Sequence, residues 1–149
     1  MAQTWKDEDI SLDPIKDQII AVIGYGIQGD AQANNMKDSG LNVIVGLKEG
    51  GSSWQKAKDD GHEVLSVSEA TKKADIVHIL IPDMVQAKVY KEEIAPNLSE
   101  GNALSFSHAA AIYWKWIVAP ENVDLIMVAP KGPGSKVRET YLQNFGTPS

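Results

Sequence analysis

The fold is decided by one stretch of the chain, Gln18-Ile19-Ile20-Ala21-Val22-Ile23-Gly24-Tyr25-Gly26-Ile27-Gln28-Gly29. A short β-branched run, typical of a buried strand, ends here at a glycine cluster with the spacing GxGxxG. In a dinucleotide-binding turn the first glycine allows the tight turn, the second lets the backbone approach a pyrophosphate, and the third lets a helix pack on the strand. The free N–H groups at the start of that helix receive the phosphates. The alternative is a glycine turn that binds no ligand.

The rest of the sequence alternates apolar runs with helix-like segments. Strands are predicted over residues 18–23, 41–46, 75–81, 102–106 and 124–128, with a short extra strand at 63–65. Helices are predicted over residues 28–39, 54–60, 66–73, 84–94 and 135–143, the third opened by a Ser66/Glu69 capping box. Continuous Val, Ile and Leu runs indicate strands covered on both faces. We therefore predict an α/β fold with a doubly wound, mainly parallel, Rossmann-like sheet in three αβα layers. We also predict that residues 1–149 form one domain, with an N-terminal arm over 1–15.

Composition excludes several classes of protein. A chain of 149 residues that is 43% hydrophobic has enough apolar surface for one ordinary core, which argues against disorder. The absence of cysteine excludes a disulfide scaffold, a thiolate zinc site and a cysteine nucleophile. A net charge of −6 with Arg138 as the single arginine argues against a nucleic-acid partner. Neither a bilayer-spanning apolar stretch nor a secretory h-region is found, so we expect a cytoplasmic protein without a membrane partner.

The choice between the two nicotinamide cofactors is expected about twenty residues beyond the glycine turn, where an NAD-binding domain places Asp or Glu. This chain has Lys48 there, followed by Ser52 and Ser53 at the start of a predicted helix. Those side chains suit a 2′-phosphate, which favours NADPH. NADH stays possible, because Glu49 suits ribose hydroxyls, and the alternative for Lys48 and the serines is a solvated lysine beside an ordinary N-cap.

Several longer segments resemble one known family. The chain reads Gly24-Tyr25-Gly26-x-Gln28-Gly29-x-Ala31-Gln32-Ala33, then Ile81-Pro82-Asp83-x-Val85-Gln86, the pair Ser107-His108, and Met127-Val128-Ala129-Pro130-Lys131-Gly132-Pro133-Gly134. Together they resemble the N-terminal domain of ketol-acid reductoisomerase over essentially residues 10–149. The resemblance implies an Mg²⁺-dependent alkyl migration on an acetohydroxy acid, followed by reduction with NADPH, in valine and isoleucine biosynthesis.

The resemblance also assigns residues to roles. It implies catalytic residues at His108 and Lys131. It implies cofactor contacts at the glycine turn, at the 2′-phosphate position, after a central strand and near the last helix: Gly24, Tyr25, Gly26, Ile27, Gln28, Lys48, Ser52, Ser53, Asp83, Met84, Val85, Gln86 and Gly134. His108 follows a predicted strand, so it lies near the strand's carboxyl end, where an imidazole can exchange protons with a ligand.

The remaining histidines and Lys131 have simpler interpretations. His78, inside a predicted strand, is expected to be a hydrogen-bonded core residue, and His62 a surface turn residue. Taken without the resemblance, His108 and Lys131 are a solvated or capping loop histidine and a solvated loop lysine.

Three positions depart from the family pattern. Asp30 stands where the family usually has His or Arg, and beside a bound pyrophosphate its carboxylate would be repelled by ~1–4 kcal/mol. Gly51 stands where many members have a serine, and residues 109–114 replace the more common Gly-Phe-Asn after the histidine.

The resemblance places the Mg²⁺ ligands on a C-terminal helical domain, and none of the acids in this chain matches them. Asp59-Asp60 and Glu92-Glu93 are interpreted as solvated helix charges, so no metal site is predicted here. We expect the chain alone to be catalytically incomplete, with the acetohydroxy acid bound only in the presence of that domain. The alternatives are a non-catalytic NADP-binding or assembly module, and a fragment of another NADP-dependent hydroxyacid dehydrogenase.

Four aromatic residues, Phe106, Tyr113, Trp114 and Trp116, lie close together in the sequence. If nothing covers them they form an association surface, and an open sheet edge beside them would favour a homodimer. The alternative is a buried amphipathic helix.

Overall fold

The computed structural model describes residues 9–149, so the first part of the predicted arm lies outside the described residues. One sheet organises the molecule, in the order β3-β2-β1-β4-β5-β6, and every neighbouring pair is parallel. Its strands are β1 (Ile19–Ile23), β2 (Asn42–Gly46), β3 (Glu63–Leu65), β4 (Ile76–Ile79), β5 (Ala103–Phe106) and β6 (Asp124–Met127). The predicted doubly wound parallel sheet is confirmed, because each predicted apolar run contains one of these strands.

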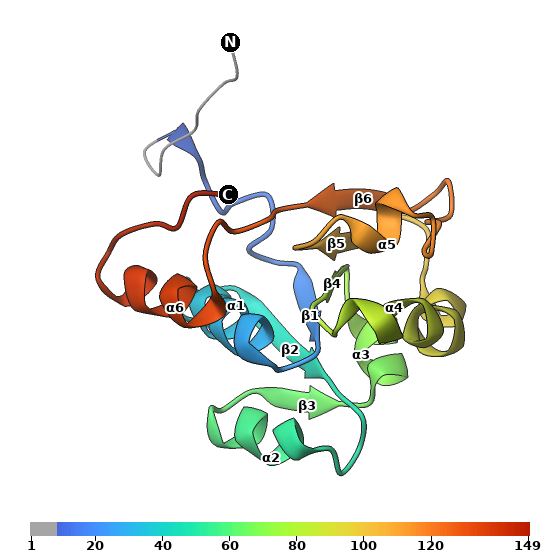
Figure 1. Cartoon of the computed structure of the whole chain (residues 1–149), viewed down its shortest axis with the longest axis horizontal. Coiled ribbons are helices and arrows are strands. Elements are labelled where there is room, and N and C mark those ends of the chain that lie inside the picture. Colours follow the sequence, from blue (N-terminus) through green and yellow to red (C-terminus); the bar gives the residue numbers. More distant parts are fainter. Residues whose placement is uncertain (1–8) are drawn as a thin grey trace.

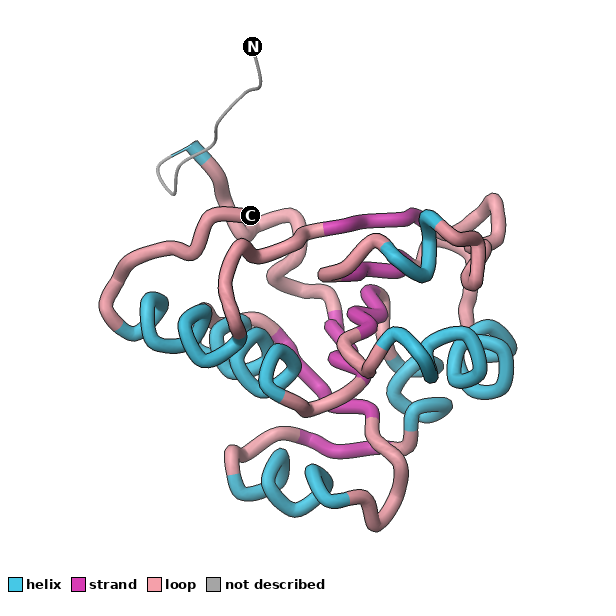
Figure 2. The backbone as a smooth tube through the Cα atoms, in the orientation of Figure 1, coloured by secondary structure: helices cyan, strands magenta, loops and turns pink. Residues whose placement is uncertain are grey.

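Helices connect the strands, as Figures 1 and 2 show. They are α1 (Ile27–Asp38), α2 (Ser52–Asp59), α3 (Val67–Lys73), α4 (Asp83–Val89), α5 (Ala110–Tyr113) and α6 (Gly134–Leu142). The α3 helix starts with the predicted capping box between Ser66 and Glu69. After α4 the chain widens into a π-helical turn, Tyr90–Ile94, and then a 3-10 turn over 95–97 that contains Pro96, so the predicted helix over 84–94 is present with a changed pitch.

Apolar side chains fill both sides of the sheet. In β1, Ala21 and Ile23 belong to the larger core with α3 and the segment after α4, whereas Val22 faces a smaller core with α1 and α2. This alternation follows from the two-residue repeat of a strand. The α6 helix lies on the same side of the sheet as α1 and packs along it, which completes three αβα layers (Figure 1).

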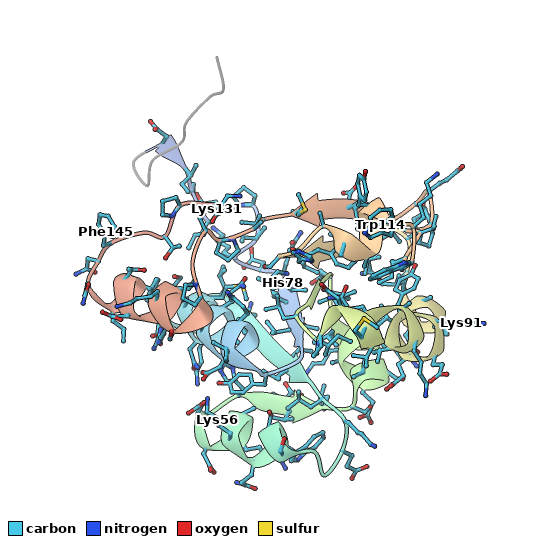
Figure 3. All side chains as sticks on the ribbon, viewed as in Figure 1. Lys56, His78, Lys91, Trp114, Lys131 and Phe145 are labelled. Atoms are coloured by element: carbon cyan, nitrogen blue, oxygen red, sulfur yellow. The ribbon has the colours of Figure 1, made fainter. Side chains whose placement is uncertain are left out.

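The β6 edge is the part of the sheet without this cover. All four residues of β6 are exposed, although three of them are apolar. The four aromatic residues of the neighbouring segment differ in burial. Phe106 is buried in β5, while Tyr113, Trp114 and Trp116 in and after the single turn of α5 are exposed. Figure 3 shows Trp114 at this edge. The structure therefore does not show the buried amphipathic helix that was the alternative interpretation.

Candidate functional site

The candidate site lies at the carboxyl edge of the sheet, where β1 and β4 are neighbours. The chain winds outward from β1 to β3 on one side and from β4 to β6 on the other, so the winding direction reverses between them. Open α/β sheets bind ligands in the crevice at such a switch point. The Gly24–Gly29 turn follows β1 and leads into α1, with Gly26 as its N-cap residue (Figure 1). The glycine motif is therefore placed where the sequence predicts it.

The three glycines of the turn have different surroundings. A Cβ atom on Gly24 would lie 2.8 Å from Cγ2 of Ile81, and Gly24 has a left-handed φ of +102°. A Cβ atom on Gly29 would lie 2.2 Å from the carbonyl oxygen of Gly24. A Cβ atom on Gly26 would meet nothing within 4 Å. Packing thus requires the first and third glycines, whereas the second leaves open space above the N–H groups of α1, which fits the approach of a pyrophosphate.

Tyr25 supports the glycine turn from inside the fold. Its side chain is buried, and its hydroxyl donates to Oδ2 of Asp60 at 2.8 Å and accepts from Nδ2 of Asn34 at 2.9 Å. Burial, together with the Asp60 hydrogen bond, raises the pKa of the phenol. The tyrosine hydroxyl therefore links α1 to the end of α2 through two hydrogen bonds.

An open cavity of about 330 Å³ lies beside the turn. It brings together four of the predicted site residues that are far apart in sequence, Gln28, Asp83, Gln86 and His108. Its full lining is Gln28, Ile79, Leu80, Ile81, Asp83, Gln86, Ser107, His108 and Pro130. The apolar floor comes from the end of β4, and the polar rim comes from α1, α4 and the loop after β5.

Asp83 holds the imidazole of His108 at this cavity. Oδ2 of Asp83 lies 3.0 Å from Nδ1 of His108, and Nε2 of Gln86 donates to Oδ1 of Asp83 at 3.1 Å and to the carbonyl oxygen of Ile81 at 2.9 Å. A carboxylate at Nδ1 orients the ring and leaves Nε2 for proton exchange with a ligand. Oε1 of Gln86 is buried and has no hydrogen-bond partner within residues 9–149.

Other predicted contacts form the outer parts of the site. Met84 and Val85, in the first turn of α4, are exposed apolar side chains next to Asp83. Lys48 is exposed in the turn between β2 and α2, and Ser52 and Ser53 form the first turn of α2. Since the amide of Gly24 donates to the carbonyl oxygen of Gly46 at 3.1 Å, the end of β2 is tied directly to the glycine turn.

Lys131 and Gly134 lie on the loop from β6 into α6. Lys131 is exposed, its amide donates to the carbonyl oxygen of Pro148, and it is not among the residues that line the cavity (Figure 3). Gly134 is buried, and a Cβ atom there would lie 2.1 Å from the carbonyl oxygen of Ile27. The lack of a side chain at Gly134 lets the start of α6 pack against the backbone of the glycine turn. The two segments are more than a hundred residues apart in sequence, so no local pattern indicates this contact.

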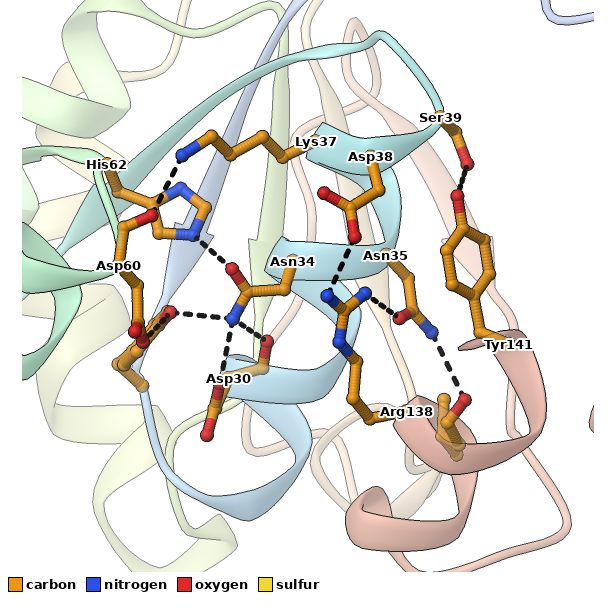
Figure 4. A network of polar contacts seen from close by, with 12 residues as sticks. Asp30, Asn34, Asn35, Lys37, Asp38, Ser39, Asp60, His62, Arg138 and Tyr141 are labelled. Atoms are coloured by element: carbon orange, nitrogen blue, oxygen red, sulfur yellow. Dashed lines mark hydrogen bonds and ion pairs between the residues drawn. The ribbon is translucent and has the colours of Figure 1, made fainter. Parts of the chain in front are cut away.

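The prediction for His62 is wrong. Its side chain is 7% exposed, and Nε2 lies 3.1 Å from Oδ1 of Asn34 (Figure 4). The ring meets that of Tyr25 edge to face, and burial lowers the pKa of His62. The sequence shows only a glycine turn, Gly61-His62, whereas the covering groups come from α1 and from the glycine turn.

Asp30 has a cation beside it that the sequence argument did not include. Its carboxylate pairs with Lys56 of α2 and accepts from Nδ2 of Asn34 at 2.8 Å (Figure 4 draws the Asn34 contact). The cation offsets part of the negative charge at the start of α1. The expected repulsion of a pyrophosphate is correspondingly reduced.

The described residues 9–149 show two further facts that bear on function. They contain no helix long and apolar enough to cross a membrane. Within the same range, no three His, Asp or Glu side chains come together as metal ligands.

Fold and site together define a doubly wound nucleotide-binding domain of the Rossmann type. The family described as acetohydroxy acid isomeroreductase, NADPH-binding domain, matches residues 14–149, and the chain belongs to that family. This decides between the two enzyme families that the sequence had left open.

Three similar proteins show the extent of the match. A ketol-acid reductoisomerase (NADP(+)) of Nitrosopumilus maritimus is 84% identical over all of this chain, which covers 45% of that relative. The structure of an NADH-preferring ketol-acid reductoisomerase from an uncultured archaeon is 54% identical over 95% of this chain and 44% of that one, with a TM-score of 0.91. A 3-hydroxyisobutyrate dehydrogenase of Mycobacterium tuberculosis, 18% identical over 83% of this chain and 44% of that one, has a TM-score of 0.65 and shares the fold alone. The chain spans about half the length of the curated relatives it matches.

Proposed function

We propose that this chain binds NADPH across the switch point, as the cofactor-binding part of a ketol-acid reductoisomerase. The observation that supports this most directly is the open space over Gly26 beside two glycines that packing requires. In this proposal the pyrophosphate contacts the backbone of residues 24–28, and the nicotinamide end reaches the cavity beside Asp83, Gln86 and His108.

We propose NADPH as the preferred cofactor because of the turn between β2 and α2. Lys48 supplies a cation, and Ser52 and Ser53 supply hydroxyls and the amides of a helix N-terminus. Glu49 is the residue that would instead favour NADH. The similar structure that prefers NADH shows that both cofactors occur among close relatives, so the choice has to be measured.

We further propose that the complete enzyme rearranges an acetohydroxy acid with Mg²⁺ and then reduces it, in valine and isoleucine biosynthesis in the cytoplasm. NADPH supplies the hydride when it is bound. His108 is placed to exchange a proton at the cavity, and Lys131 would reach the substrate from the loop before α6. In this proposal the Mg²⁺ ligands and the rest of the acetohydroxy acid site come from the part of the family enzyme that this chain does not span, because the chain covers about half the length of its curated relatives.

The cofactor proposal is tested by titrating the chain with NADPH and with NADH, with calorimetry as the readout. Lys48→Ala should raise the Kd for NADPH about tenfold, as expected for the loss of one charge-assisted contact, and should leave the Kd for NADH within about twofold. Lys91→Ala removes the same charge from the segment after α4 and is the matched control. Absence of NADPH binding by the unmodified chain would overturn the proposal.

A non-catalytic NADP-binding module is the second candidate, because the chain spans about half the length of the curated relatives it matches. Incubation of the chain with acetolactate, Mg²⁺ and NADPH distinguishes the two. We expect binding of NADPH without its oxidation by the chain alone. Turnover by the chain alone would contradict the assignment of Mg²⁺ and substrate to residues outside it.

We also propose that the β6 edge pairs with a second copy of the chain. The exposed apolar residues Leu125 and Ile126, and the exposed Trp114 beside them, support this. Sedimentation at rising concentration should show a dimer that Ile126→Lys abolishes. A monomer at every concentration would contradict the pairing.

A further inference from the structure

A buried histidine next to the candidate site has a complete set of hydrogen-bond partners. His78 lies on β4, is 6% exposed, and sits in the interior of the fold (Figure 3). Its Nε2 lies 2.8 Å from Oε1 of Gln32 on α1, and its Nδ1 lies 2.9 Å from Oγ of Ser105 on β5. The prediction of a hydrogen-bonded core histidine is therefore confirmed.

The contact with Gln32 continues to the candidate site. Nε2 of Gln32 donates to Oε1 of Gln28 at 3.0 Å and to Oγ of Ser107 at 3.2 Å. Nε2 of Gln28 donates to the carbonyl oxygen of Gly132 at 3.0 Å. Gln28 and Gln32 are four residues apart and share one face of α1. One buried ring is thus connected to the glycine turn, to the residue before His108 and to the loop that carries Lys131.

The direction of every bond along this path follows from its last member. A backbone carbonyl only accepts, so the Gly132 oxygen must face the amide nitrogen of Gln28. The side-chain oxygen of Gln28 therefore accepts from the amide nitrogen of Gln32. The side-chain oxygen of Gln32 then lies next to Nε2 of His78. Oε1 of Gln32 also lies 3.3 Å from the hydroxyl oxygen of Ser107. An unprotonated Nε2 would place a second acceptor 2.8 Å from Oε1, so the ring carries its proton on Nε2, and Nδ1 accepts from the hydroxyl of Ser105.

The surroundings of the ring keep it uncharged. Burial lowers the pKa of His78 to about 4, against a smaller opposing contribution from the backbone of Ser105. The groups that face the ring are Gln32 from α1, Ser105 from β5 and its β1 neighbour Val22, none of which is charged. A neutral ring with its proton on Nε2 donates to Gln32 and accepts from the hydroxyl of Ser105, so both hydrogen bonds form without a buried charge.

We propose that His78 is a positioning residue of the dinucleotide site, which acts as its Nε2–H tautomer by fixing the carboxamide of Gln32. Gln32 in turn holds Gln28 of the glycine turn and Ser107 beside His108 in one arrangement. This inference rests on the proposed function for its effect on cofactor binding, but the tautomer and the bond directions belong to the chain itself.

The first test reads the ring directly by nitrogen-15 NMR of the full chain. We expect a protonated-type signal for Nε2 and an unprotonated type for Nδ1 of His78, unchanged from pH 8 to pH 5. The side-chain NH₂ signals of Gln28 and Gln32 should move in His78→Leu. A proton on Nδ1, or an unmoved Gln28 signal, overturns the proposal.

The second test measures NADPH binding in matched variants. His78→Leu removes the donor to Gln32 and should raise the Kd about tenfold, the effect of one lost buried hydrogen bond. His78→Gln offers an N–H at the same position and should restore the Kd to within about threefold of the unmodified chain. Val77→Ala truncates the adjacent β4 residue on the opposite face; it should lower stability while leaving the Kd within about twofold.

The outcomes separate the two proposals. If the unmodified chain does not bind NADPH, the proposed function fails, and the NMR signals alone decide whether His78 fixes Gln28. If the unmodified chain binds NADPH and His78→Leu binds it equally well, the positioning role fails and the proposed function stands. An equal loss of affinity in Val77→Ala would also overturn the positioning role, because it would trace the loss to general destabilisation.

Discussion

Strands β1 and β6 belong to the same parallel sheet and are both apolar, yet Ile20–Ile23 of β1 are buried and every residue of β6 is exposed. The region around β1 has helices on both faces and hydrogen-bonded strands on both sides. Among residues 9–149, the region around β6 has β5 on one side and the short α5 nearby. Apolar composition therefore predicts that a strand forms, whereas its neighbours decide whether the strand contributes to the core.

The largest expected effect is a break in the well-packed region. Gly29→Ala places a methyl group 2.2 Å from the carbonyl oxygen of Gly24. Because Gly24 directly follows β1, the turn can relieve this clash only by moving away from the end of that strand. We expect a loss of about 4 kcal/mol of unfolding free energy, at the upper end for single substitutions, or failure to fold. Chemical denaturation measures it.

Gly26→Ala is the matched control for that change, since its methyl group meets open space. We expect its unfolding free energy to stay within about 1 kcal/mol of the unmodified chain, the cost of one ordinary backbone position. Equal destabilisation by the two substitutions would show that the turn is sensitive to any side chain and not to the Gly24 contact.

A pair of leucines in register compares the two regions directly. Leu104 of β5 lies opposite Leu125 of β6, and the first is fully buried while the second is 48% exposed. Leu104→Ala should cost about 3 kcal/mol, typical of a buried leucine, and Leu125→Ala less than about 1 kcal/mol. Urea unfolding below the concentration at which copies associate gives both values. A large cost at Leu125 would mean that β6 is covered in solution.

Acid should lower the free energy of unfolding, because the well-packed part of the fold contains two buried histidines. His78 is held neutral in the fold, with its pKa lowered to about 4 by burial, whereas the unfolded chain takes up the proton near pH 6.5. Stability is therefore full above pH 6.5 and falls as the pH drops toward 4, by about 3 kcal/mol for this shift. Burial lowers the pKa of His62 too, so it contributes with the same sign.

Unfolding free energies of the unmodified chain and of His78→Leu, measured at steps from pH 7 to pH 4, check this expectation. The variant should start lower at pH 7 but fall less steeply below pH 6.5. Parallel curves would show that another group causes the acid sensitivity.

The sequence predicts the fold well because its signals are local. Branched apolar runs mark all the strands to within two residues, and the glycine motif marks the turn that begins α1. The capping box marks the start of α3 because both of its partners lie within four residues.

The parts that the sequence does not predict depend on contacts between distant segments. His62 is buried by Tyr25 and Asn34, and Gly134 is required by the backbone of Ile27. For the same reason, the exposed position of Tyr113 and Trp114 could not be chosen over burial from their sequence. The family resemblance assigns His108 and Asp83 to the candidate site. Their contact with each other, and the hydrogen bonds that connect His78 to Gln28, are visible only in the structure.

The strand order has a consequence for how the molecule is made. Each strand, in the order in which it leaves the ribosome, joins beside one already synthesised: β2 and β3 extend the sheet from β1 in one direction, then β4, β5 and β6 extend it in the other. Each strand can therefore pair with an exposed edge of the sheet as soon as it is synthesised, and none has to insert between two strands that are already present. Among residues 9–149, β6 is the last strand to be synthesised, and it lies at the exposed edge of the sheet.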